Sequence, residues 1–237
     1  MKQQLDLEDI KDKLYKRLEE SGWAVKLRSF IYSSDFDNII KQLAKLSTDG
    51  KRFTPKLSQM FRAFEECPLE TLKVVMVGQD PYPQFGVADG IAFSCGVTKE
   101  LQPSLKYMLN EVNRDVYKGN PGSLDPDLTR WANQGILMLN VALSTTVGKP
   151  GQHYSIWQPF LAYLFDYLTW NQSGLVYIYM GKEAKTWSEA VNENNYKFFL
   201  THPASAAYAN DERWDSKNVF NETNKIMENL YSYKIKW

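Results

Sequence analysis

The stretch LKVVMVGQDPYPQFGVADGIAFS, residues 72–94, decides the fold that this sequence predicts. Its first six residues, Leu72 to Val77, are apolar except for one lysine, and a glycine follows them. A short apolar run of this kind is typical of a strand that is buried on both faces in a parallel sheet. We therefore expect a central strand that ends at Gly78.

The loop after this strand carries polar side chains where α/β proteins commonly bind ligands. In an open α/β sheet, ligand sites form beyond the carboxyl ends of the strands. Asp80 and Tyr82 follow the strand directly, and Pro81 and Pro83 restrict the backbone on either side of Tyr82. The alternative interpretation is a plain proline-rich turn in which Asp80 makes a turn hydrogen bond.

Further apolar runs predict three more strands, at residues 135–140, 175–180 and 196–200. A helix capped by Ser34 or Asp35 is expected to end near Gly50. The other expected helices cover residues 5–20, 23–32, 60–65, 105–117, 128–133, 157–169, 183–192 and 215–230.

Strands that alternate with helices favour an α/β fold with right-handed crossovers. We predict a single-domain three-layer α/β/α sandwich with a central, four-stranded, mainly parallel sheet. The one domain spans residues 1–237, and residues 1–20 form a peripheral N-terminal helix.

Composition limits the classes of function. The chain has 237 residues, of which 43% are hydrophobic, and this is ample for a globular core. Its 28 basic residues equal its 28 acidic residues, so a protein that coats long stretches of nucleic acid is disfavoured and any DNA contact must be local. Two cysteines support neither a disulfide scaffold nor a zinc site built from several thiolates.

The chain shows no signal peptide and no apolar run near the roughly 18 residues of a membrane span. From this and from the low cysteine content we expect an intracellular protein without membrane contact. We expect it to be located in the cytoplasm, or in the nucleus if the source is a eukaryote.

The four predicted strands end on residues that can act together. The ends carry Asp80 with Tyr82, then Asn140, then Gly181, then His202. Parallel strands place these ends at one edge of the sheet, so we expect a carboxylate, an amide, an imidazole and an aromatic ring in one cleft. Such a set can read a planar polar ring and assist bond cleavage on it.

Several ordered motifs resemble those of the family 1 uracil-DNA glycosylases. The resemblance covers about residues 20–237 and rests on GQDPYP at 78–83, AFS at 92–94, Pro-Ser at 103–104, LMLN at 137–140, the glycine loop at 181 and HP at 202–203. It implies an enzyme that flips uracil out of DNA and hydrolyses its N-glycosidic bond, without a metal or another cofactor.

The resemblance also implies roles for single residues. Phe93 matches the ring that stacks on the flipped base, and Asn140 matches the amide that pairs with uracil N3–H and O4. Tyr82 fills the space of a thymine methyl group, and the backbone of Gln79 contacts uracil O2.

The resemblance assigns the two catalytic roles to a carboxylate and an imidazole. Asp80 matches the carboxylate that stabilises the cationic sugar and orients water. His202 matches the imidazole that bonds to O2 of the leaving anion.

The resemblance places contacts to the DNA backbone on loops around the cleft. The residues expected there are Pro103, Ser104, His153, Gly181, Lys182, Ser205 and Tyr208.

The chain also departs from the family pattern at positions that matter for DNA. Pro83 replaces the usual histidine after GQDPY, and Lys182 replaces a serine of the glycine loop. The HPSPLS motif becomes HPASAA, so that Ala206 stands where a bulky leucine wedge is expected and is too small for that role. Tyr208 is the candidate to replace it.

The expected partner is uracil-containing DNA, single- or double-stranded, and the resemblance adds a proteinaceous glycosylase inhibitor. We expect a monomer. A DNA-binding or replication-associated module with weak activity is an alternative that the sequence leaves open. A nucleotide-binding enzyme is disfavoured because GQDPYPQFG lacks the GxGxxG and GxxxxGK[ST] phosphate cradles.

Overall fold

A computed structural model of the chain describes residues 5–120, 122 and 124–237. Its main sheet has the strand order β3-β2-β5-β6, and all three pairings are parallel. The strands are β2 (Val74–Gly78), β3 (Ile136–Asn140), β5 (Val176–Met180) and β6 (Tyr196–Leu200). Every residue of β2 and β5 is buried, as the apolar runs predict.

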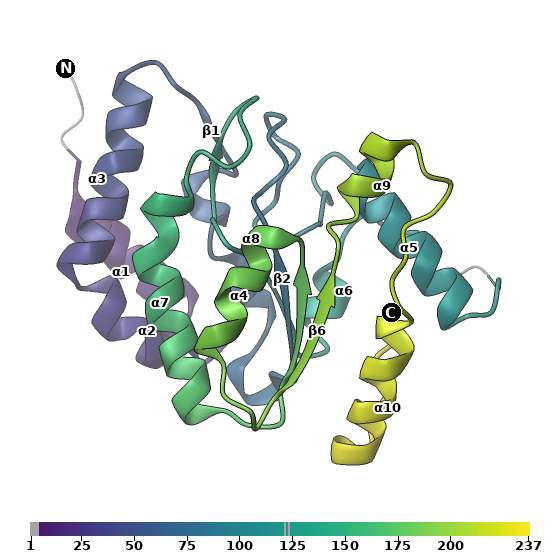
Figure 1. Cartoon of the computed structure of the whole chain (residues 1–237). Coiled ribbons are helices and arrows are strands. Elements are labelled where there is room, and N and C mark those ends of the chain that lie inside the picture. The colour runs from purple at the N-terminus through teal and green to yellow at the C-terminus, as the bar shows by residue number, and fades with distance from the viewer. Residues whose placement is uncertain (1–4, 121, 123) are drawn as a thin grey trace.

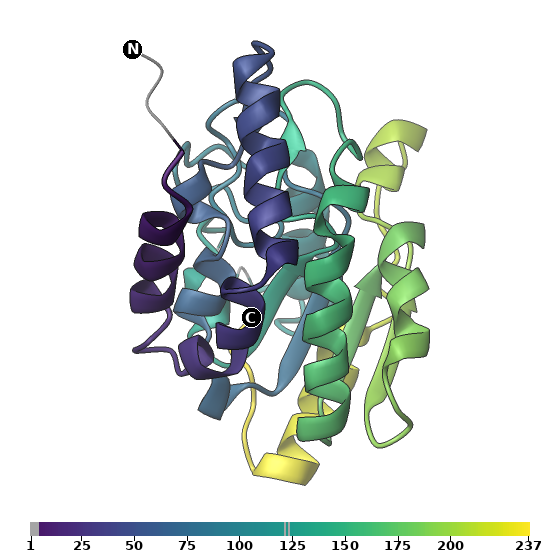
Figure 2. The ribbon, with the colours of Figure 1, turned by 90° about the vertical axis from the view of Figure 1, so that its left-hand side faces the viewer.

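Helices cover both faces of this sheet (Figure 1). Those on one face, which Figure 2 brings to the front, include α1 (Leu7–Arg17), α2 (Trp23–Ile31), α3 (Ser34–Thr48), α7 (Tyr154–Asn171) and α8 (Lys182–Lys185). Those on the other face include α5 (Pro103–Asp115), α9 (Ala204–Ala209) and α10 (Val219–Tyr231). The predicted three-layer α/β/α sandwich with a parallel four-stranded sheet is confirmed.

Shorter elements complete the described chain. They are α4 (Arg62–Glu66), α6 (Thr129–Ala132) and the 3₁₀ helices Leu57–Gln59, Leu69–Thr71 and Thr186–Ala190. A second sheet consists of β1 (Phe53–Thr54) and β4 (Thr145–Thr146), paired antiparallel. No helix within the described residues is long and apolar enough to cross a bilayer.

Several predicted helix bounds are wrong for local reasons. The helix expected at 105–117 begins at Pro103, because the fixed φ angle of proline suits the first helical turn. The helix expected to start at residue 215 starts at Val219, because the Lys217 N–H donates to Asp215 Oδ1 at 2.9 Å and closes a turn there. The cap of α3 is Ser33, whose hydroxyl accepts from Phe36 N at 3.3 Å.

Other differences concern the type or length of an element. The helix expected at 183–192 is the short α8 followed by a 3₁₀ helix, and α7 begins at Tyr154 instead of residue 157. Neither α9 nor the β1–β4 sheet, whose strands have two residues each, was predicted from the sequence.

The N-terminal segment packs on the body of the protein through one side of α1. Leu14 and Leu18 are buried, and the Arg17 guanidinium pairs with Glu65 of α4. Residues 1–4 lie outside the described residues.

Candidate active site

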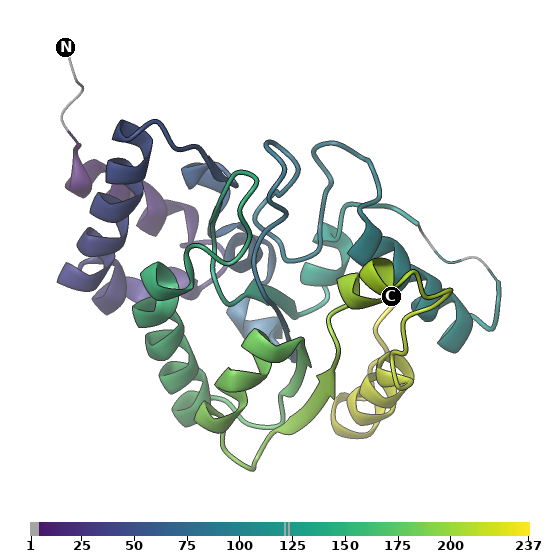
Figure 3. The same cartoon turned by 45° about the horizontal axis from the view of Figure 1, so that its top comes forward.

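The loops that follow β2, β3, β5 and β6 lie together at the top of Figure 1, and Figure 3 turns this end toward the viewer. A cleft of about 560 Å³ opens between the loops after β2, β3 and β6 and the start of α5. It is lined by Gln79, Asp80, Pro81, Tyr82, Pro83, Gln84, Phe93, Gln102, Pro103, Ser104, Asn140, Pro150, Gly151, Tyr154, His202, Ala204, Ser205, Ala207 and Tyr208.

The structure brings together all the residues expected to bind or cleave the base. Those lining the cleft are Gln79, Asp80, Tyr82, Phe93, Asn140 and His202. Of the residues expected to contact DNA, four line it as well, namely Pro103, Ser104, Ser205 and Tyr208. His153, Gly181 and Lys182 do not.

Asp80 lies just beyond the carboxyl end of β2, and the loop that follows β4 holds it there. Its Oδ2 accepts a hydrogen bond from the Gly151 N–H at 2.6 Å. Burial raises the pKa of this carboxyl, and the bonds from Gly151 and the Thr145 side chain offset part of that rise. The carboxylate is therefore fixed in position and poorly solvated, so that its charge, when it is ionised, is weakly screened by water.

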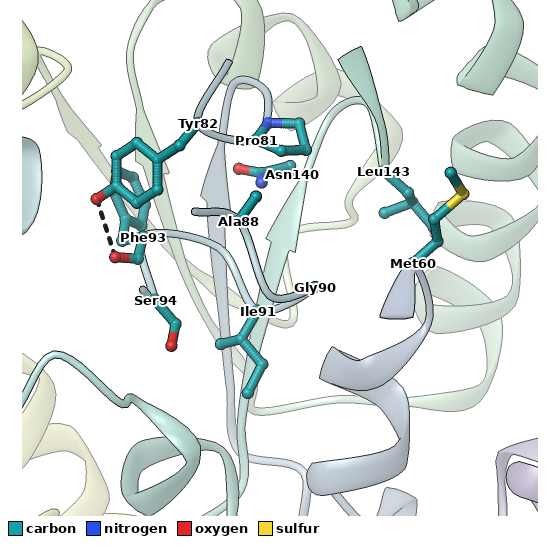
Figure 4. Close-up of a pocket in the computed structure, with 10 residues that line it drawn as sticks. All are labelled: Met60, Pro81, Tyr82, Ala88, Gly90, Ile91, Phe93, Ser94, Asn140 and Leu143. Atoms are coloured by element: carbon teal, nitrogen blue, oxygen red, sulfur yellow. Dashed lines mark hydrogen bonds between the residues drawn. The ribbon is translucent and has the colours of Figure 1, made fainter. Parts of the chain in front are cut away.

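Asn140 ends β3 directly opposite Gly78 at the end of β2. A Cβ atom at Gly78 would lie 2.5 Å from Asn140 Oδ1 and 3.1 Å from the ring of Phe93. Only glycine therefore lets the amide and the ring approach the strand this closely. Figure 4 shows Asn140, Phe93 and Tyr82 around a small inner pocket of about 10 Å³ that continues the cleft.

Phe93 is held in an unusual backbone conformation. Its φ angle of +65° lies in the left-handed region, which bulky residues rarely adopt. The Tyr82 hydroxyl donates to the Phe93 carbonyl at 2.9 Å, as the dashed line in Figure 4 marks. Strain of this kind persists only where the surroundings fix it, so the position of the Phe93 ring is determined by its neighbours.

Asp89 is the main support of the loop that carries Phe93. Its carboxylate is fully buried and accepts from Ile91 N at 3.2 Å, Ser94 Oγ at 2.7 Å and Gly96 N at 3.0 Å. Arg62 Nη1 neutralises it at 3.0 Å. Four partners on one buried carboxylate fix the loop on both sides of Phe93.

His202 lies beside Phe93, with ring centroids 5.5 Å apart. Burial lowers the pKa of His202 to about 4, so the ring is neutral at neutral pH. Its Nδ1 accepts a hydrogen bond from Ala204 N at 3.2 Å. A neutral ring whose Nδ1 accepts carries its proton on Nε2, which leaves Nε2–H as a donor.

Gly181 does not line the cleft but packs against two residues that do, Gln79 and His202. Its φ angle is +99°, and a Cβ atom there would lie 2.6 Å from Gln79 Nε2 and 3.1 Å from His202 Cβ. Glycine thus permits the close packing of two loops that line the cleft. Lys182 follows as the exposed first residue of α8.

His153 is buried beneath the cleft, with 1% of its surface exposed. Its Nδ1 lies 2.8 Å from Ser144 Oγ, and its Nε2 lies 3.0 Å from Thr146 Oγ1. Burial lowers the pKa of His153 to about 4. Because both ring nitrogens are occupied inside the protein, this placement does not fit the phosphate contact expected of His153.

The loop after β6 also differs from the expectation. Ala206, on α9, is 3% exposed and faces the protein interior. It is therefore not a surface position from which a larger side chain could act as a wedge. Tyr208, two residues later, is 87% exposed and lines the cleft. The large exposed side chain of this loop is therefore Tyr208.

Three residues that shape the site were not predicted from the sequence. Gly151 anchors Asp80, and Tyr154 lines the cleft beside it. Asp89 holds the Phe93 loop. The position of Asp89 in the largely apolar stretch 85–93 was a usable signal, because a carboxylate that such a stretch buries needs partners.

Comparison with known proteins places the chain among relatives of one kind. The sequence profile of the Uracil DNA glycosylase superfamily matches residues 64–228. A uracil-DNA glycosylase of Acinetobacter baumannii (strain SDF) is 33% identical over 232 residues, which are 97% of each chain. One from Mesomycoplasma hyopneumoniae (strain 7448) is 31% identical and covers 90% of this chain and 97% of its own.

Solved structures share the fold. The crystal structure of mimivirus uracil-DNA glycosylase aligns with a TM-score of 0.82 at 22% identity, over 98% of this chain and 89% of its own. A variant of mimivirus UNG, crystallised in complex with UGI, aligns with a TM-score of 0.81 at 23% identity, over 91% of this chain and 87% of its own.

Proposed function

The chain belongs to the uracil-DNA glycosylase superfamily, and from this premise we propose that it flips uracil out of DNA and hydrolyses the N-glycosidic bond. The products are free uracil and an abasic site in an uncut strand, so the enzyme is monofunctional. One observation carries the proposal: Asp80, Asn140 and His202 come from three separate strand ends and line a single cleft with Phe93.

Recognition of uracil follows from the polar groups of the inner wall. The Asn140 side chain offers an acceptor to N3–H and a donor to O4. Cytosine presents the reverse pattern at these two positions, so it leaves both groups unpaired. Phe93 stacks on the ring of the base, and Tyr82 occupies the space that a thymine methyl group would need.

Cleavage develops positive charge on the sugar and negative charge on the uracil. Asp80 stabilises the cationic sugar and orients the attacking water. The Nε2–H of neutral His202 donates to uracil O2 as the anion leaves. Groups held in place for charge that develops in the transition state are typically worth on the order of 10²–10³-fold each.

The DNA strand is held by groups around the cleft. Ser104 and Pro103 begin α5, where backbone N–H groups favour a phosphate. Ser205, three residues after His202, contacts the same DNA strand. Lys182 adds a positive charge beside the cleft. Tyr208 takes the wedge position that Ala206 cannot fill. We also propose that a proteinaceous inhibitor of the UGI type occupies this cleft, since a mimivirus UNG variant was crystallised with UGI.

The proposal is tested by incubating the purified chain with single-stranded and duplex oligonucleotides that each contain one uracil, in the presence of EDTA. We expect free uracil and alkali-labile sites from both substrates, because no step of the proposed reaction uses a metal. Release from neither substrate would contradict the enzyme. Binding of uracil-containing DNA without release would favour the DNA-binding module instead.

A further inference from the structure

Three segments meet at the rim of the cleft on the side of β1. Val147 N donates to Arg52 O at 2.9 Å, and Gly148 N donates to Pro83 O at 2.9 Å. In the small sheet Phe53 pairs with Thr146, which joins the residues around β1 to the loop after β4. The residues before β1, the loop after β2 and the loop after β4 are thus tied into one surface, which we call the β1 rim (residues 51–54, 83–86 and 147–151).

Phe85 is the exposed aromatic residue of this rim. It is 57% exposed, although it lies only a few residues from Asp80 and Tyr82 in the same loop. The guanidinium carbon of Arg52 lies 4.6 Å from the centroid of its ring. The ring is therefore not part of the core, and its cation–π contact with Arg52 holds it at the surface.

The charge of the β1 rim is of one sign. Its three segments contain Lys51, Arg52 and Lys149 and no acidic residue, and Lys56 follows shortly after. Arg52, Lys56 and Lys149 are exposed, and none of them is in an ion pair with another described residue. In a chain with zero formal net charge, this is a local basic surface directly beside the cleft.

We propose that the β1 rim binds the nucleotide next to the flipped uracil, with its base stacked on Phe85 and its phosphate near Arg52. The proposal rests on the proposed function and adds a stacking site to it. Exposed aromatic rings among basic side chains are the pattern by which proteins hold single-stranded nucleic acid, because every base offers a face for stacking. The phosphate attracts the guanidinium of Arg52, which already lies against the ring.

The position of the rim fits a strand that crosses the cleft. The rim stands on the β1 side of the strand ends, and α9 with Tyr208 stands on the other side (Figures 1 and 3). A strand whose uracil enters the cleft would meet an exposed ring on each side. Phe85 has the larger part in single-stranded DNA, where the neighbouring base is free to leave its own stack.

The decisive experiment measures Phe85 and the neighbouring base together. Single-stranded oligonucleotides carry one uracil and a normal base, or no base, at the 5′ or the 3′ neighbouring nucleotide. For one of these two positions we expect loss of the base to raise the KM of the unaltered protein about tenfold with little change in kcat. Phe85→Ala should raise the KM on the complete substrate by a similar factor and abolish the sensitivity to that base, whereas Phe85→Trp should retain it.

Salt dependence tests the role of Arg52. Arg52→Gln should weaken binding and reduce the slope of log affinity against log salt concentration by about 0.7, the value for one phosphate of a single strand. Arg28→Gln is the matched control, since Arg28 lies 5.3 Å from the ring of Tyr32 in a similar pair and neither residue lines the cleft. Trp170→Ala controls for the loss of an exposed ring, because Trp170 lies at the opposite end of α7 from Tyr154.

Equal sensitivity to the neighbouring base in Phe85→Ala and in the unaltered protein would overturn the stacking site. Equal effects of Arg52→Gln and Arg28→Gln on the salt slope would overturn the phosphate contact of Arg52. Both outcomes leave uracil release by the unaltered protein intact, so they are distinct from a failure of the proposed function, in which no uracil is released at all.

Discussion

Burial shifts the pKa values of the two acid–base groups in the cleft in opposite directions, and both shifts favour the uncharged form. Burial raises the pKa of Asp80 and lowers that of His202 to about 4. The site thus combines a carboxylate that is costly to ionise with an imidazole that stays neutral. This suits the proposed reaction, in which negative charge is needed only beside the sugar and a neutral donor is needed at the base.

Asp80→Asn should lower turnover by on the order of 10²–10³-fold while single-stranded uracil-containing DNA still binds. The amide keeps the shape and the bond to Gly151 but has no charge to stabilise the sugar. Single-turnover rates and binding titrations check this. In the unaltered protein, kcat should fall as the pH is lowered through a pKa above the ordinary aspartate value, and turnover near normal in Asp80→Asn would contradict the assignment.

Tyr82→Ala should admit thymine, because it opens the space next to C5 of the base. Since the Tyr82 hydroxyl also holds the Phe93 carbonyl, we expect uracil release to slow as well. Chromatography of bases released from matched thymine and uracil oligonucleotides measures both effects. A variant that still releases uracil but no detectable thymine would count against methyl exclusion by Tyr82.

At the scale of elements, two short segments shape the cleft. The first is α9, on which Ala206 faces inward and Tyr208 outward. Replacing Ala206 by leucine would overpack the interior, at a typical cost of about 1–3 kcal/mol, so it is not a way to restore a wedge.

Tyr208→Ala should slow uracil release from duplex DNA more than from single strands. A large ring at the wedge position compensates for the unstacking that flipping requires, and a single strand has less stacking to lose. Parallel measurements of kcat/KM on the two substrates give the ratio. Equal losses on both would mean that Tyr208 contacts the strand without acting as a wedge.

The second segment is the loop 88–96, which depends on Asp89. Asp89→Ala would leave the N–H groups of Ile91 and Gly96 without an acceptor and would remove the fully buried partner of Arg62, and each buried polar group left unpaired typically costs about 1–3 kcal/mol. Denaturant unfolding measures the loss. Asp89→Asn is the matched control, since it keeps two polar atoms in place. If both variants unfold like the unaltered chain, the loop does not depend on this carboxylate.

At the scale of the whole molecule, the buried His153 makes the stability of the folded state depend on pH in the acid range. Burial lowers the pKa of His153 in the folded state to about 4, whereas the unfolded chain has a value near the ordinary 6.5. The unfolded state therefore binds more protons below pH 6.5, and stability is lost as the pH falls from 6.5 toward 4. The difference corresponds to at most about 3 kcal/mol.

His153→Gln should therefore flatten the dependence of unfolding free energy on pH between 6.5 and 4. The variant will be less stable at neutral pH, because glutamine cannot reproduce both bonds to Ser144 and Thr146. Denaturant unfolding at a series of pH values gives the two slopes. An unchanged slope would place the acid sensitivity elsewhere, and His202 is then the next group to replace.

Much of the fold could be predicted from the sequence because the four strands are short apolar runs with a clear end. The convergence of Asp80, Asn140 and His202 followed from the geometry of parallel strands. The elements that escaped are those whose local sequence carries little signal. The alanine-rich α9 has no apolar stripe, and β1 and β4 exist only because two distant segments pair.

The remaining features depend on tertiary contacts that sequence spacing does not reveal. His153 stands near the expected loop position, but its burial depends on Ser144 and Thr146. The contact between Arg52 and Phe85 joins residues from segments that only the small sheet brings together. The starts of α5 at Pro103 and of α10 at Val219 were misplaced from the sequence. A proline favours the first turn of α5, and a side-chain hydrogen bond closes a turn just before α10, and hydrophobic periodicity reveals neither.

The division of the reactive groups among strand ends has a practical consequence. Residues 172–175 connect α7 to β5, and a cut there would leave Asp80 and Asn140 on one fragment and His202 on the other. Neither half would hold a complete set, and base release would return only when the halves reassociate along the β2–β5 seam. On the proposed function, a cut at this point gives a split reporter that forms abasic sites in DNA only when its two halves associate.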